Sequence, residues 1–137
     1  MDLGDLSGEP LFKLICPNAL LGAVDLFLVP HHGSTDTTYP AVLAGFHPTA
    51  VVVNNGPNKG GQAPAFDALH AFQPLQDVWQ LHRSTLSDVR NYPDPQIANL
   101  DTSTEHWLKA VAMRDGSFSI TNTRTGETRA YRPSSVR

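Results

Sequence analysis

The sequence predicts an α/β fold that ends in antiparallel hairpins, and three features of the chain lead to this prediction. Short apolar runs bounded by turn residues are typical of buried strands, and three of them precede residue 82. The segments between them have capping residues and a proline at their starts, as helices do. After residue 106, shorter strand-like segments are separated by Asp115-Gly116 and Thr125-Gly126, which are typical turn pairs.

The first part of the chain alternates helices and strands at the spacing of βαβ units, which favours parallel strand pairing. Proline follows each expected helix within a few residues and limits its length. We expect helices from Ser7 or Gly8 to about Ile15, from Thr37 or Thr38 to about Gly45 and from Pro64 to Phe72, and strands over residues 24–30, 49–54 and 77–81.

The second part changes character. Residues 84–105 are polar, contain Pro93 and Pro95 and show no hydrophobic period, so we expect a long surface loop. Residues 107–113, 117–122 and 128–131 are expected to form antiparallel strands.

The strand over residues 24–30 leads directly into His31-His32-Gly33-Ser34. In open α/β folds, ligands bind at the carboxyl ends of the parallel strands. Asp5 follows a second apolar-to-acid junction, so a carboxylate and two imidazoles can meet at one rim and form part of a metal site. The alternatives are a hydrogen-bonded loop at the histidines and a helix cap at Asp5.

Several blocks of the chain also match a known family in order and spacing. They are Asp2-Leu3-Gly4-Asp5, Glu9 in a short helix, residues 24–34, His47-Pro48 and residues 51–56. From Asp2 to about Tyr131, the chain resembles the carboxyl-terminal half of a metallo-β-lactamase-fold hydrolase. It is most similar to the branch that includes the hydrolase domain of DNA-uptake channel proteins. The resemblance implies half of an αββα sandwich with an antiparallel carboxyl-terminal hairpin region.

The resemblance implies a metal-dependent hydrolase with a two-metal zinc site, or a manganese site. Metal-activated water would attack an ester or phosphodiester-like bond of a small-molecule or phosphodiester substrate in the intact protein. Asp5 would bridge the metals and act in catalysis. Because side chains of adjacent residues diverge on an extended backbone, we expect only one of the two histidines to be a ligand. We favour His31, with His32 as an orienting group or proton donor.

Substrate contacts are expected from Ser34, from His82 at a strand end and from the loop over residues 54–61. Exposed backbone N–H groups and the charge of Lys59, next to Asn58, can hold an anionic group there. A plain turn is the alternative for this loop. His47, His70 and His106 are interpreted as structural.

Two departures from the family are plain. The His-x-His-x-Asp-His block of the family's amino-terminal half is absent, and Gln62 stands near the position where the DNA-uptake branch carries histidine. We therefore expect residues 1–137 to form a single partial domain that is inactive alone and binds metal weakly or not at all. The alternative function is a non-catalytic α/β binding or assembly module. A homodimer through an exposed sheet face is expected, because half a sandwich leaves that face bare.

Composition excludes several other classes. The net charge of −3 gives no strong nucleic-acid signal, although five arginines lie between residues 114 and 137. Cys16 is the only cysteine, which excludes an intrachain disulfide, and we expect it to be buried. The chain as written has neither a signal peptide nor a membrane-spanning stretch, so we expect a soluble protein, without predicting its location.

Overall fold

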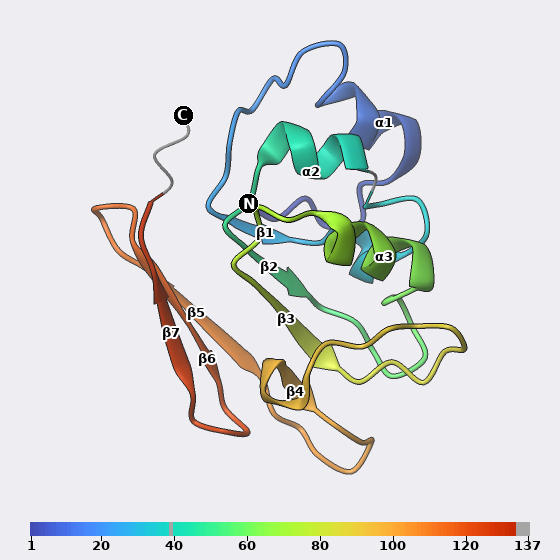
Figure 1. The fold of residues 1–137 in the computed structure, drawn as a ribbon, viewed down its shortest axis with the longest axis vertical. Helices are drawn as coiled ribbons and strands as arrows, with labels where there is room; N and C mark the ends of the chain where they lie inside the picture. Colours follow the sequence, from blue (N-terminus) through green and yellow to red (C-terminus); the bar gives the residue numbers. More distant parts are fainter. Residues whose placement is uncertain (39, 134–137) are drawn as a thin grey trace.

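The computed structural model describes residues 1–38 and 40–133, which form three layers (Figure 1). The middle layer is a parallel sheet of β1 (Leu26–Leu28), β2 (Ala50–Val53), β3 (Asp77–His82) and β4 (Ile97–Asn99). Helices α1 (Gly8–Lys13), α2 (Pro40–Phe46) and α3 (Ala63–Ala71) lie on one side of it. An antiparallel sheet of β5 (Leu108–Ala112), β6 (Phe118–Asn122) and β7 (Thr128–Tyr131) lies on the other. The predicted α/β class with an antiparallel carboxyl-terminal region is confirmed.

The parallel sheet has the strand order β1-β2-β3-β4, and each strand is parallel to its neighbour. β1 is shorter than the strand expected over residues 24–30. Val24 donates its backbone N–H to the carbonyl of Phe46 in α2 rather than to a neighbouring strand, and Pro30 begins a 3₁₀ turn. The first residue also pairs with this edge, since Leu28 donates its N–H to the carbonyl of Met1 at 2.9 Å.

The expected loop over residues 84–105 contains an element that sequence analysis missed. A 3₁₀ turn, Asp94–Gln96, leads into β4, whose three residues are all buried. β4 pairs with the end of β3 through Gln80 with Ile97 and His82 with Asn99. A strand of three residues is too short to produce a detectable hydrophobic period, and the flanking prolines suggested a loop.

The helix-side core follows the alternation of the central strands. Phe27, Val51 and Val53 point toward the helices and pack against a set of buried helical side chains: Leu11, Val42, Leu43, Phe46, Phe66 and Leu69. Cys16 is only partly buried at the margin of this core, so the expectation that it is buried was too strong. In the described part of the chain, none of the helices has the length and apolar character needed to cross a membrane.

The opposite face of the parallel sheet is packed against the antiparallel sheet. Ala50 and Trp79 are completely buried there, against Phe118, Ile120 and Tyr131 of β6 and β7. Phe118 and Tyr131 stack with ring centroids 4.6 Å apart. The carboxyl-terminal hairpins therefore cover the face over β2 and β3 that we expected to be bare.

A buried polar cluster joins the two sheets. Trp79 Nε1 donates to the Tyr131 hydroxyl at 2.8 Å, and this hydroxyl donates to Asp77 Oδ2 at 2.8 Å. Asp77 Oδ1 accepts from Arg129 and, at 3.1 Å, from Gln96. Asp77 is only 8% exposed, so its charge needs these donors. We call Asp77, Trp79, Arg129 and Tyr131 the inter-sheet clasp.

Replacing Tyr131 with phenylalanine should destabilise the protein. The change leaves the Trp79 N–H without an acceptor and removes one donor from a buried carboxylate, so we expect a loss of about 1–3 kcal/mol in the free energy of unfolding. Urea denaturation measures this loss. Tyr92→Phe is the matched control, since Tyr92 lies outside the clasp; an equal loss in both variants would contradict the role of the clasp.

Candidate functional site

The carboxyl ends of β1, β2 and β3 form one rim of the parallel sheet, and each is followed by polar residues. His31 and His32 follow β1, Asn54 and Asn55 follow β2, and β3 ends at His82. Because parallel strands end at the same edge, these residues gather there by topology alone. We call this edge the carboxyl rim.

The two histidines lie in an unusual backbone turn. His31 has φ 48° and ψ 40°, His32 has φ 59° and ψ 16°, and Gly33 has φ 76°. The extended backbone on which we expected the two side chains to diverge is therefore not present. Left-handed conformations in successive residues other than glycine are strained, and such strain is concentrated at functional sites. Their ring centroids lie 6.4 Å apart.

Backbone hydrogen bonds hold this histidine turn from both sides. His31 donates its N–H to the Gly4 carbonyl at 2.8 Å, and the His32 carbonyl accepts from Gly61 at 2.8 Å. Gly60 makes the second contact feasible, because a Cβ at this position would lie 2.2 Å from the His32 carbonyl oxygen. The loop after β2 and the histidine turn therefore interlock through the backbone.

The His32 ring is oriented by a carbonyl and faces a carboxylate. Its Nδ1 lies 2.8 Å from the Asn54 carbonyl oxygen, which can only accept, so Nδ1 carries the proton. Its Nε2 lies 3.8 Å from Asp5 Oδ1. Asp5 is largely exposed and lies in a turn before α1, whose N-cap position is occupied by Ser7. The structure thus brings Asp5 and His32 together.

His31 differs in its surroundings. Its Nδ1 is buried and has no hydrogen-bond partner among the residues that the structure describes. A buried imidazole nitrogen without a partner is uncommon and calls for an explanation by an ion, a water or a ligand.

His82 is held at the rim by a residue that the sequence analysis did not single out. Asn55, 1% exposed, donates from Nδ2 to the His82 carbonyl at 2.8 Å, and its Oδ1 accepts from the His82 N–H at 3.4 Å. The position of Asn55 shortly after the buried strand β2 was the signal that could have identified this residue. Burial lowers the pKa of His82, and its Nδ1 has no partner within the described chain.

The remaining expected site residues make local contacts. Ser34 donates its hydroxyl to Asp36 Oδ1 at 3.0 Å, a local side-chain contact within its own loop. Asn58 and Lys59 are exposed at the tip of the loop, where the Lys59 carbonyl accepts from Gly56. Their side chains are free to meet a ligand.

The other three histidines have structural contacts. His70 stacks on Tyr92 at 4.2 Å and donates from Nε2 to the Arg90 carbonyl at 2.8 Å. His47 meets the edge of Phe72, and His106 binds Asn99 through its backbone.

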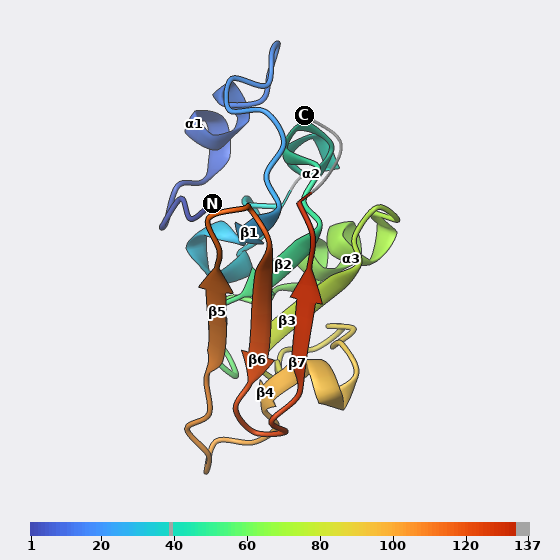
Figure 2. The same ribbon diagram turned by 90° about the vertical axis from the view of Figure 1, so that its left-hand side faces the viewer.

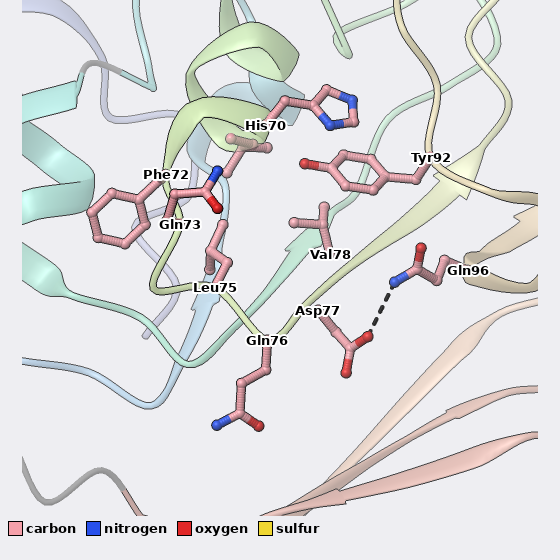
Figure 3. Close-up of a pocket in the computed structure, with 10 residues that line it drawn as sticks. His70, Phe72, Gln73, Leu75, Gln76, Asp77, Val78, Tyr92 and Gln96 are labelled. Carbon is pink, nitrogen blue, oxygen red and sulfur yellow. Dashed lines mark hydrogen bonds between the residues drawn. The ribbon is translucent and has the colours of Figure 1, made fainter.

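A cavity of about 180 Å³ lies at the other end of β3 (Figure 3). His70, Tyr92, Asp77 and Gln96 line it, and Gln96 donates to Asp77. It is separate from the carboxyl rim, and its carboxylate is already paired within the inter-sheet clasp.

Within residues 1–38 and 40–133, no group of three or more histidine, cysteine, aspartate or glutamate side chains is placed to hold a metal ion. Asp5 and His32 therefore form a pair rather than a complete ligand set. Comparisons of the chain with protein-family models, curated proteins and solved structures found no match.

Substitution of Gly60 by alanine should disrupt the histidine turn. The new Cβ would collide with the His32 carbonyl, in addition to the cost of a positive φ of 66°. We expect a loss of about 1–3 kcal/mol, measured by urea denaturation. Gly126→Ala is the matched control, because Gly126 also has a positive φ but has open space around it. Equal losses would show that the contact with His32 contributes nothing.

His82 should make the stability of the protein pH-dependent. Since its pKa is lowered in the folded state, the unfolded chain binds more protons below pH 6.5. The contribution of neutral His82 to the free energy of unfolding is therefore complete above pH 6.5, and it is lost as the pH decreases toward the folded-state pKa. We expect the free energy of unfolding to decrease less between pH 7.5 and 5 in His82→Gln than in the original chain. Identical pH profiles would contradict this.

Proposed function

We propose that the carboxyl rim contributes ligands to the metal centre of a metal-dependent hydrolase. The observation that carries the proposal is the state of His32, whose Nδ1–H is donated to a carbonyl while Nε2 is left facing the Asp5 carboxylate. Metal-binding histidines commonly have this arrangement, because a hydrogen bond at one ring nitrogen fixes the tautomer and orients the other nitrogen toward the ion.

The distance between the two side chains supports a shared cation. Histidine nitrogen and carboxylate oxygen both bind zinc at about 2.0–2.2 Å, so two ligand atoms of one ion are at most about 4.2 Å apart. Asp5 Oδ1 and His32 Nε2 are 3.8 Å apart. A small rotation of the exposed Asp5 side chain would bring them to a tetrahedral ligand spacing.

This geometry changes the roles that the sequence suggested. The proposal makes His32, rather than His31, the ligand that accompanies Asp5. His31, with its unpartnered Nδ1, is the candidate for a contact with a second ion or with the substrate. A catalytic zinc site needs three protein ligands, so the proposal requires further ligands from another polypeptide segment, as the family resemblance implies.

A bound divalent cation would supply hydroxide at neutral pH for attack on an ester or phosphodiester-like bond. This chain would contribute the negative charge of Asp5 and a fixed imidazole at His32. The loop over residues 54–61 would hold the anionic part of the substrate, since Lys59 carries an exposed positive charge there.

Metal binding tests the proposal. Two ligands bind more weakly than the four of a structural site, so we expect Mn²⁺ or Zn²⁺ to bind the isolated chain with a dissociation constant above about 1 µM. Paramagnetic Mn²⁺ should broaden the NMR signals of the His32 ring, and of the neighbouring His31 ring, far more than those of His70. Asp5→Asn and His32→Gln should each remove the binding.

His70→Gln is the matched control and should leave metal binding unchanged, because His70 is engaged by Tyr92 and Arg90. Equal broadening of His70 and His32, or binding unaffected by Asp5→Asn, would contradict the assignment. Hydrolysis of a nitrophenyl phosphodiester is expected to be absent in the isolated chain with metal. Measurable hydrolysis by the isolated chain, at the same rate in Asp5→Asn, would also contradict it.

A further inference from the structure

Strand β5 is an open edge of the antiparallel sheet with apolar side chains exposed around it. The strand order is β5-β6-β7, and Figure 2 shows β5 as the outer strand on one flank of that sheet. Trp107 and Met113, which flank β5, are 61% and 56% exposed. An exposed apolar edge strand is a template for pairing with another strand, and natural proteins usually protect such edges.

The backbone groups that β5 offers to a partner follow from its register with β6. The Trp107 carbonyl accepts from Thr123, and Met113 donates its N–H to Ser117. In an antiparallel pair, alternate residues bond to the neighbour. Residues 107, 109, 111 and 113 therefore bond toward β6, and Leu108, Ala110 and Ala112 direct their N–H and C=O groups outward.

We propose that two copies of this chain associate through β5, antiparallel about a two-fold axis at Ala110. In this register Leu108 of each copy pairs with Ala112 of the other, and the two Ala110 residues pair with each other. All outward N–H and C=O groups of β5 then find partners. The two antiparallel sheets join into one continuous six-stranded sheet, an isologous contact of the kind that closes dimers.

The side chains favour the same register. Lys109 lies opposite Val111, so the only charged side chain of β5 faces an apolar one, along which its aliphatic stem can pack. Trp107 lies opposite Met113, which places the two exposed apolar residues in contact. A register centred on residue 109 would oppose two lysines, and one centred on residue 111 would leave Leu108 without a partner in β5.

The contact is expected to be weak. A five-residue strand pair buries less than the roughly 800 Å² per partner of a standard stable interface. Beyond the strand, the register also sets the exposed Glu105 opposite the exposed Asp115, and their repulsion is screened by salt. The dimer should therefore form at high protein concentration and strengthen as salt is raised. It is independent of the proposed metal centre.

Disulfide cross-linking tests the register. In a Cys16→Ser background, Ala110→Cys places two thiols in a hydrogen-bonded pair with Cα atoms about 5.5 Å apart, within the range of a disulfide. Ala112→Cys is the matched control, since its two copies would be four residues apart along the sheet, about 13 Å. We expect Ala110→Cys to cross-link under mild oxidation and Ala112→Cys to remain monomeric.

Sedimentation across a concentration series tests the edge itself. Ala110→Pro removes an N–H that points away from β6, so it should abolish the dimer while preserving the cooperative melt of the monomer. A chain that stays monomeric at millimolar concentration would overturn the proposal. So would cross-linking of Ala112→Cys as fast as that of Ala110→Cys, or a dimer that Ala110→Pro leaves intact.

Discussion

The burial of the Asp77 carboxylate between the two sheets is the constraint on which the rest of the structure depends. A carboxylate in a residue that is 8% exposed is stable only with donors around it. Two of these donors, Arg129 and Tyr131, lie in β7, more than fifty residues further along the chain. Arg129 also lies over the Trp79 ring at 5.5 Å, so the same residues supply charge compensation and apolar contact. The clasp fixes β7 against β3 and thereby sets how the hairpins cover the parallel sheet.

Buried amides perform a similar task for the loops. Gln80 donates to Asn91 and accepts from Tyr92, and Asn99 donates to the carbonyls of Leu81 and His106. Each amide lies in a strand and holds a segment that has no regular structure of its own. The long connection between β3 and β5 is thus ordered by individual side chains rather than by a continuous apolar face.

This difference explains what could be predicted from the sequence. The alternation of helices with β1, β2 and β3 follows from local apolar runs and prolines, and so does the antiparallel end of the chain. β4 could not be predicted, since its three residues are ordered by pairing with β3 and by Asn122, which donates to the Ile97 carbonyl. The gathering of His31, His32 and His82 at one rim follows from parallel topology. The conformation of the histidine turn does not, because it depends on contacts with Gly4 and Gly61.

The close approach of Gly60 to the His32 carbonyl limits how this rim can be altered. The left-handed histidines and the glycine loop are two halves of one backbone unit, joined with too little space for any side chain between them. Neither the histidine turn nor the glycine loop can therefore be replaced on its own by the corresponding loop of another protein. A graft of the paired histidines onto another parallel sheet would have to transfer both loops and preserve the spacing between the two strands that carry them.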